Sequence, residues 1–323
     1  MGLVDKQGSA EAITTHQANV VLPKGISKDR FWHIPFHKSD LIIKVGSASI
    51  MDNLVIASCR AGLGNRLKCL LSAMRLSPEV RIIWPKWRSV KAPFKYYFEN
   101  DLEIEQAPKG AEIYRNWNFI VLPGDNWAEI RALSPLHDVA PSKAQGVYLE
   151  DMYDQMPQRI RDAFVAAARI LKVEAGVQSI VDMVLAQLPS SYIGVHIRTW
   201  DDDSRKAVTY RIDSYLEAMR RFSGHTFLVC SDSVKCIQTV KAIFGGRALS
   251  REDFLMTDRG LLKEQWALVD MLLLGNAEEM IVTEASTFTE AGWFLSGARA
   301  RVHVVRPTKE GYIALANYRR PQE

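Results

Sequence analysis

An apolar strand that runs straight into a cluster of charges is the clearest sign of chemistry in this chain. Residues 192–206 read YIGVHIRTWDDDSRK, so the strand ends in His196, Arg198, three aspartates and two more cations. Residues two apart on a strand face the same side, so His196 and Arg198 should point together. An arginine fork suits phosphate oxygens, and a histidine can contact a phosphate or a base edge. Because open α/β folds bind ligands at the carboxyl ends of their strands, we expect a ligand here.

The same charges allow a plainer interpretation. Arg198 can pair with Asp201 or Asp202 at the surface, which would make the cluster an ordinary solvated strand end. The strand alone does not decide between the two.

A glycine turn earlier in the chain is a second candidate. The strand LVIAS is followed by CRAGLGN and then by a helical pattern, which places Gly62, Gly64, Asn65 and Arg66 between strand and helix. Glycines there let backbone N–H groups approach an anion or a sugar, and the helix N-terminus favours negative charge. The turn lacks the third glycine of a dinucleotide fingerprint and the GK[ST] of a P-loop. A tight turn without a ligand is the alternative.

Asp270 stands within ALVDMLLLG, a predicted helix whose other residues are almost all apolar. A buried carboxylate is costly, so Asp270 should be paired, lie at a polar edge of the helix, or bind a ligand. Guanine has adjacent N–H and NH₂ donors that would satisfy a carboxylate bidentately, whereas adenine has no such pair. An exposed aspartate on an amphipathic helix is the alternative.

The segment EASTFTEAG, residues 284–292, leads from a strand into a helix. Ser286, Thr287 and Thr289 are good N-cap residues, and Glu290 could form a capping box with Thr287. The same hydroxyl and N–H groups can hold a phosphate, although a cap with no ligand fits the sequence equally.

Composition excludes several classes of protein. The chain has 323 residues with 41 basic and 37 acidic side chains, a net charge of +4 that is too small and dispersed for a dedicated nucleic-acid binder. The four cysteines show no zinc-type spacing, and we expect reduced, mostly buried thiols. No secretory signal and no run of about 18 apolar residues is present. We therefore expect a soluble cytoplasmic protein without a transmembrane segment.

Alternating strands and helices dominate the second half of the chain and predict a doubly wound parallel sheet. We expect a poorly ordered extension over 1–25, a first domain over 26–188 and a second over 189–323, with the boundary before Pro189. The predicted strands are LVIAS, RIIWP, NFIVLP, YIGVHIR, HTFLVCSD, EMIVTE and RVHVV, and the predicted helices are RLKCLLSAMRLS, QRIRDAFVAAARILKV, VQSIVDMVLAQL, RIDSYLEAMRRF, SVKCIQTVKAIF, KEQWALVDMLLLG and FTEAGWFLSG.

The first half also carries four tryptophans in an irregular, aromatic-rich segment. Trp84, Trp87, Trp117 and Trp127 are interpreted either as core residues or as a platform on which a sugar stacks.

Taken in order, these motifs resemble those of the GDP-fucose-dependent α-1,6-fucosyltransferases, which include nodulation enzymes and N-glycan core enzymes. The resemblance is carried by the GxG turn, GVHIR, IDSYLEAM, FLVCSDS, ALVDMLLL and IVTEASTFT, over about residues 54 to 305. It implies a GT-B glycosyltransferase with two Rossmann-like domains facing a cleft, inverting chemistry, no metal and no cofactor. It also implies GDP-fucose as the donor and a glycan as the acceptor, with no nucleic acid as a partner.

The resemblance also implies roles for single residues. His196 and Asp270 would hold guanine, Arg198 the diphosphate, and Ser286 with Thr287 a phosphate; Asp232 would also contact the nucleotide. The turn at Gly62, Gly64, Asn65 and Arg66 would meet the donor sugar or the acceptor.

The loop after Arg198 departs from the family pattern. The pattern of the core enzymes has a Lys followed by a Glu in this loop, whereas this chain has Asp202 and then Lys206. A carboxylate must accept the proton of the acceptor hydroxyl, so Asp201, Asp202 and Asp203 are the candidate bases. The exchanged charges leave open another nucleotide sugar as the donor, or a non-catalytic glycan-binding relative. Acceptor, linkage and oligomeric state are also left open.

Overall fold

A computed structural model describes residues 54–77, 79–86, 90–109, 111–115, 119–121, 145–147, 153, 155–198, 210–254 and 260–311. All of them belong to one compact unit, Lys38–Glu323. The predicted extension over 1–25 lies outside this part of the chain.

The first half is built on a small parallel sheet with the strand order β2-β1-β3. Its apolar central strand is followed by the glycine turn and then by α1, as the sequence predicts. The elements are β1 (Val55–Ser58), α1 (Leu63–Met74), β2 (Val80–Ile83) and β3 (Glu112–Arg115), with a separate antiparallel pair, β4 (Phe119–Val121) and β5 (Gln145–Val147).

Two helices follow the first sheet. They are α3 (Gln158–Ile170) and α4 (Ala175–Leu185), and the carboxylate of Glu174 caps α4 by accepting from the Val177 N–H at 2.9 Å. The predicted boundary before Pro189 falls in the link from α4 to the next strand; the division into separate domains stays a prediction.

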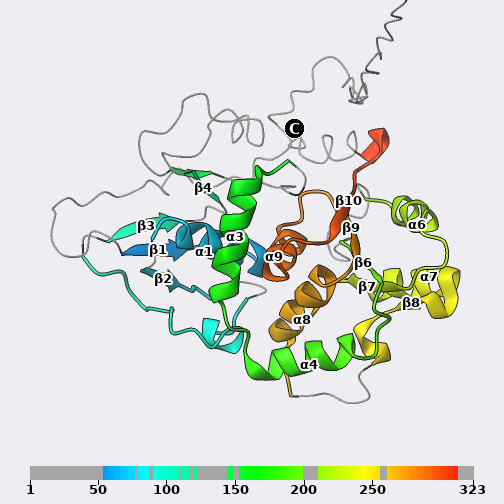
Figure 1. Cartoon of the computed structure of the whole chain (residues 1–323), viewed down its shortest axis with the longest axis horizontal. Coiled ribbons are helices and arrows are strands. Elements are labelled where there is room, and N and C mark those ends of the chain that lie inside the picture. The colour runs from blue at the N-terminus through cyan, green and yellow to red at the C-terminus, as the bar shows by residue number, and fades with distance from the viewer. Residues whose placement is uncertain are drawn as a thin grey trace, which may run out of the picture. The chain divides into compact units, whose positions relative to one another are not determined.

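The second half is a five-stranded, wholly parallel sheet in the order β10-β9-β6-β7-β8. The predicted α/β class and doubly wound pattern are confirmed (Figure 1). The elements are β6 (Ile193–Ile197), α6 (Ile212–Arg220), β7 (Phe227–Ser231), α7 (Val234–Phe244), β8 (Ala248–Leu249), α8 (Lys263–Gly275), β9 (Glu279–Thr283), α9 (Thr287–Leu295) and β10 (Arg301–Val305).

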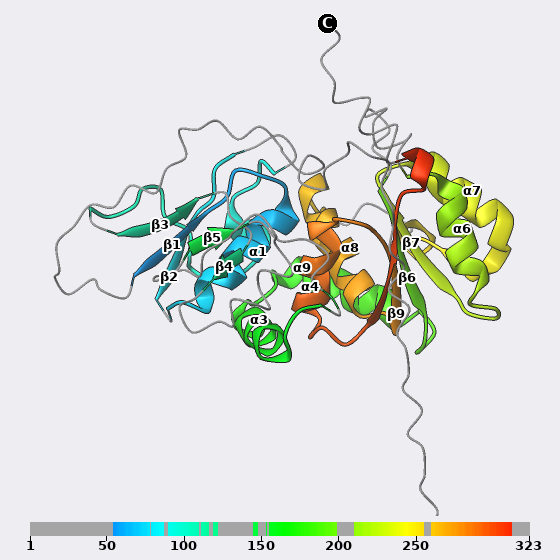
Figure 2. The ribbon, with the colours of Figure 1, turned by 90° about the horizontal axis from the view of Figure 1, so that it is seen from above.

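Alternate residues of these strands pack on opposite layers of helices. Phe227 and Val229 of β7 join a cluster with α6 and α7, whereas Leu228 and Cys230 join a larger cluster with α8. Figure 2 shows α6 and α7 on one side of this sheet and α8 and α9 on the other. The larger cluster continues through α3 and α1 to β1, so one core connects both sheets.

Helix α9 lies at the centre of that core and touches its neighbours at glycines. A Cβ on Gly275 of α8 would lie 2.2 Å from the Gly292 carbonyl oxygen, and one on Gly292 would lie 2.4 Å from that of Met271. A Cβ on Gly64 of α1 would lie 2.4 Å from the Thr287 carbonyl oxygen. Backbone therefore packs directly on backbone at these three points, which no larger residue allows.

The cysteine prediction is confirmed: all four are free thiols, and Cys59, Cys69 and Cys230 are buried. Within the described ranges, no helix has the length and apolar character needed to cross a bilayer.

The two glycines of the turn before α1 should differ sharply in their tolerance of a methyl group. Gly64→Ala drives a Cβ into α9 and should lower the free energy of unfolding by about 1–3 kcal/mol. Gly62→Ala is the matched control, because nothing lies within 4 Å of its Cβ position and its φ of −64° suits alanine. Urea denaturation measures both. Equal stability of the two variants would contradict the close contact between α1 and α9.

Candidate functional site

The N-termini of α1 and α9 lie side by side. Gly64 meets Thr287, and one turn further along both helices Lys68 forms an ion pair with Glu290. Because both contacts advance in the same chain direction, the two helices start together and run roughly parallel. Helix α1 follows β1 and α9 follows β9, so the junction lies at the carboxyl ends of both parallel sheets. This is where open α/β proteins bind ligands.

The turn that begins α9 has an unusual backbone. Ala285 has a φ of 56°, a left-handed conformation that costs free energy for a residue with a Cβ. Ser286 is the N-cap residue, yet its side chain caps nothing. Its Oγ is buried and has no hydrogen-bond partner in the part of the chain that the structure describes. A buried hydroxyl in this state, next to the free N–H groups of a helix N-terminus, suits a ligand oxygen.

The predicted capping box is wrong. Helix α9 begins at Thr287, so the cap position belongs to Ser286, and Glu290 turns toward α1 to pair with Lys68. Neither Lys68 nor Glu290 has any exposed side-chain surface. A buried lysine strongly requires an anionic partner, and this demand outweighs a local cap.

His196 lies against the first turn of α9. Its ring is 7% exposed and stacks on Phe288 with centroids 5.0 Å apart and planes at 18°. Arg198, two residues on, is half-buried. Phe288 thus packs its ring on His196, while its backbone nitrogen lies 2.6 Å from the Gly64 Cβ position.

A buried hydroxyl pair fixes the end of this strand. The Thr283 hydroxyl accepts from the Arg198 N–H at 3.1 Å and donates to the His196 carbonyl at 3.2 Å. With its proton committed, it accepts from the Tyr215 hydroxyl at 2.7 Å. Burial raises the pKa of Tyr215, which keeps it a donor. Sequence reasoning missed both residues; a threonine ending an apolar strand was the signal.

Asp270 forms an ion pair, which is one of the possibilities that the sequence analysis gives. The alternative of an exposed aspartate on an amphipathic helix is wrong. Its carboxylate accepts from Arg251, and 17% of its side chain is exposed. Burial raises the pKa of Asp270 to about 6, with Arg251 opposing the shift. The neighbouring thiol is Cys230, which pairs in register with His196 on the adjacent strand. Asp270 and His196 therefore share one side of the sheet.

Arg66 holds the glycine turn together from inside. The buried guanidinium donates from Nε to the Ala61 carbonyl at 2.8 Å and from Nη2 to the Pro85 carbonyl at 2.6 Å, and it lies over the Trp84 ring at 4.7 Å. Burial lowers the pKa of Arg66. Its predicted contact with a ligand stays a prediction. Gly62, by contrast, has open space at its Cβ position, and Asn65 is half-buried in the first turn of α1.

The remaining predicted residues fall into three groups. Trp84 is a core residue, since it is 6% exposed and donates to the Ala92 carbonyl. Asp232 is exposed at the carboxyl end of β7. The other predicted residues lie outside the described part of the chain: Asp201, Asp202, Asp203, Lys206, Trp87, Trp117 and Trp127.

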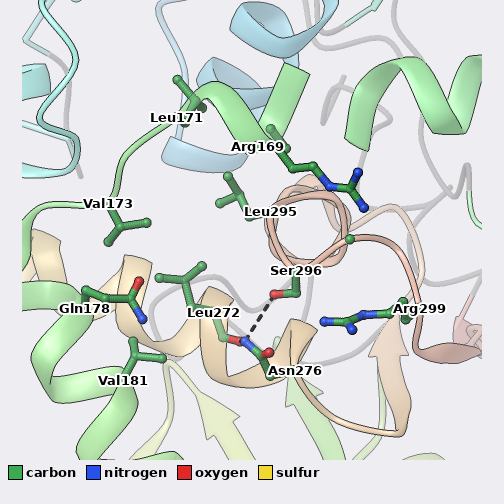
Figure 3. A pocket seen from close by; sticks show the side chains of 12 residues that line it. Arg169, Leu171, Val173, Gln178, Val181, Leu272, Asn276, Leu295, Ser296 and Arg299 are labelled. Atoms are coloured by element: carbon green, nitrogen blue, oxygen red, sulfur yellow. Dashed lines mark hydrogen bonds between the residues drawn. The ribbon is translucent and has the colours of Figure 1, made fainter. Parts of the chain in front are cut away.

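A pocket of about 480 Å³ lies at the opposite end of α9 (Figure 3). Its walls include Asn276 and Ser296, the C-cap residues of α8 and α9, together with Arg169 and Arg299. Helix C-termini favour cations, which accounts for the two arginines without a ligand. The orphaned Ser286 hydroxyl, the histidine and the paired N-termini all lie at the other end. Among the described residues, no group of three or more His, Cys, Asp or Glu side chains gathers as metal ligands.

Comparisons with known proteins find similarity in structure alone. No protein-family model matches the chain, and no curated protein matches it in sequence. Similar solved structures include the α-1,6-fucosyltransferase NodZ soaked with GDP-fucose, which is 19% identical, with 75% of this chain and 92% of that chain covered and a TM-score of 0.47. Another is the fucosyltransferase NodZ from Bradyrhizobium, also 19% identical, with a TM-score of 0.46.

Two further structures are those of a variant of Arabidopsis thaliana FUT1 with GDP and of POFUT1 with GDP. FUT1 is 13% identical, with 84% of this chain and 74% of that chain covered and a TM-score of 0.48. POFUT1 is 12% identical, with 80% and 99% covered and a TM-score of 0.43. All these TM-scores lie below 0.5, so only the residues of this chain can support a function.

Replacing Arg251 should destabilise the protein more at pH 8 than at pH 5. In Arg251→Met the pKa of Asp270 rises further, because the cation that lowers it is gone. A folded-state pKa above the unfolded value costs stability as pH rises through it, so the loss relative to the parent should grow between pH 5 and pH 8. Arg247→Met is the control, since Arg247 packs on Phe227 and Phe244 rather than on a carboxylate. Urea denaturation at both pH values is the measurement; a loss independent of pH would contradict this role.

Proposed function

We propose that this chain is a glycosyltransferase that moves fucose from GDP-fucose to a hydroxyl of a glycan acceptor. One observation carries the proposal: two helix N-termini, a Ser286 hydroxyl that is buried without a partner among the described residues, and the His196 ring lie at the carboxyl ends of the parallel strands. The ordered motifs that resemble the α-1,6-fucosyltransferases contain these residues. A site suited to anions, on the same side of the sheet as a half-buried aspartate that could bind a base, fits a nucleoside diphosphate sugar.

The electrostatics of the junction favour a diphosphate. Each helix N-terminus carries roughly half a positive charge. Two parallel helices that start together place these partial charges side by side, where they repel, and an anion between them would relieve that repulsion. The first N–H groups of both helices, with Gly62 open beside them, can donate to phosphate oxygens. Arg198, at the end of the adjacent strand, would add a fixed positive charge.

Asp270 would read the base. Guanine presents two adjacent donors to a carboxylate, and the four lone-pair positions of Asp270 can serve both the base and Arg251. His196, whose neighbour in the sheet is Cys230 beside Asp270, would contact the same base.

The proposed chemistry follows from charge. As the bond between fucose and GDP breaks, negative charge grows on the diphosphate, and fixed donors stabilise that charge more in the transition state than in the ground state. The acceptor hydroxyl loses its proton to a carboxylate, for which Asp201, Asp202 and Asp203 stay the predicted candidates. We propose an inverting reaction that needs neither metal nor cofactor. A cytoplasmic location likewise stays a prediction.

The engagement of Asp270 by Arg251 favours a second candidate within the same class. If the Asp270 carboxylate bonds to Arg251 alone, it does not recognise guanine, and the donor would be a different nucleotide sugar. The non-catalytic, glycan-binding alternative stays open as well and is distinguished by turnover: the proposal expects GDP release from GDP-fucose with a glycan acceptor, and Arg198→Ala should abolish it.

Nucleotide selectivity tests the donor directly. GDP should stabilise the protein against heat more than ADP, UDP or CDP at the same concentration, because a ligand that binds the folded state raises its stability in proportion to ln(1 + [L]/Kd). Asp270→Asn should remove the preference for GDP over ADP while leaving diphosphate binding. Asp213→Asn is the control, since that aspartate pairs with Arg211 on the exposed surface. Equal stabilisation by all four nucleotides would contradict the proposal.

The preference for GDP over ADP should also depend on pH. Guanine can donate to both oxygens of Asp270 only when the carboxyl group is ionised, and the pKa of that group is raised to about 6. The ratio of GDP affinity to ADP affinity should therefore fall as the pH drops from 7.5 to 5. The ratio is the useful quantity because the terminal phosphates of the two nucleotides titrate alike. Calorimetric titrations across this range provide it, and a ratio that does not change with pH would exclude Asp270 as the reader of the base.

A further inference from the structure

The turn that begins α9 belongs to the second half of the chain, yet residues of the first half hold it. Gly64 and Lys68 of α1 contact its backbone and Glu290, as described above. A third contact comes from Tyr153, which lies before α3 and is 2% exposed. Its ring packs edge-on against Trp293 of α9 with centroids 5.3 Å apart.

The Tyr153 hydroxyl starts a short relay of hydrogen bonds. The Thr289 hydroxyl donates to the Ser286 carbonyl at 3.0 Å. With its proton used there, Thr289 accepts from the Tyr153 hydroxyl at 2.8 Å. All three groups are buried, so the relay runs in a medium where hydrogen bonds are strong.

The last group of this relay also accepts the first backbone hydrogen bond of α9, from the Glu290 N–H at 3.2 Å. The Ser286 carbonyl and the Thr287 N–H belong to one planar peptide unit and point in opposite directions. The relay therefore adds a second hydrogen bond that holds the carbonyl toward the helix and the Thr287 N–H away from it. Ala285 holds its strained φ just before this unit, and such a conformation persists only where surrounding contacts determine it.

We propose that Tyr153 is a positioning residue for phosphate binding: through Thr289 it orients the Ser286 to Thr287 peptide, so that the first half of the chain sets the diphosphate affinity of the second. The buried pair of Lys68 and Glu290 keeps the two helices in register while Tyr153 sets the peptide plane. This inference rests on the proposed function, since it takes a nucleoside diphosphate as the ligand at α9.

Tyr153→Phe tests it with the smallest possible change, and GDP and guanosine are the probes for calorimetry. The variant should bind GDP about 3- to 10-fold more weakly, the equivalent of about one net hydrogen bond, while its affinity for guanosine stays unchanged. A residue that only stabilises the fold would lower the melting temperature without moving the ratio of the two affinities.

Tyr97→Phe is the matched control. Tyr97 is also a fully buried tyrosine of the first half, but its hydroxyl has no hydrogen-bond partner among the described residues and its ring packs on Trp84. This variant should keep the GDP to guanosine ratio of the parent. Thr289→Val removes the same relay from its other end and should reproduce Tyr153→Phe, and the double variant should be no weaker than Thr289→Val alone, because both break one relay.

The outcomes separate the inference from the proposed function. If the parent binds GDP more tightly than guanosine and Tyr153→Phe leaves that ratio intact, the positioning role is overturned while the proposed function stands. Additive losses in the double variant would also overturn it. If the parent protein binds no GDP at all, both fall.

Discussion

The close packing of α9 against its two neighbours is the constraint on which the rest of the structure depends. Backbone meets backbone at Gly64, Gly275 and Gly292, and any side chain at these points would push the helices apart. Because α9 touches α1 of one half and α8 of the other, these contacts join both sheets into one core. They also hold the turn at the start of α9 against the glycine turn before α1. The geometry of this junction is therefore set by packing alone.

This packing carries electrostatic costs that a stability argument alone does not explain. Two parallel helices with adjacent N-termini repel, a lysine and a glutamate lie fully buried between them, and the Ser286 hydroxyl has no partner in the described structure. Replacing a buried ion pair with apolar residues is often neutral or stabilising. The proposed function accounts for these costs, because an anion bound between the two N-termini would turn their repulsion into attraction for a phosphate.

The sequence predicts those parts of the structure that depend on residues close together in the chain, and it does not predict contacts between distant residues. The strands and helices of the second half are predicted, apart from the two-residue strand β8, because apolar runs and breaks are local. The strand to glycine to helix pattern around Gly64 is predicted for the same reason. The ion pair of Lys68 with Glu290 joins residues 222 apart, which no local pattern reveals. The capping-box prediction is wrong for the same reason, because Glu290 pairs with Lys68. Likewise Arg66, with donors that suit a ligand, turned inward because two carbonyls and the Trp84 ring surround it.

In the proposed function, base recognition and phosphate binding lie on different elements. Asp270 belongs to α8 and is tuned by Arg251, whereas the phosphate groups would meet α9 and α1, which the first half positions. The sheet connects the two, since Cys230 beside Asp270 is paired with His196, whose ring stacks on Phe288. Change in base preference can therefore arise at α8 without disturbing the junction. Under the same proposal, a change in the first half would reach the phosphates through α9 and leave the base contacts on α8 unchanged.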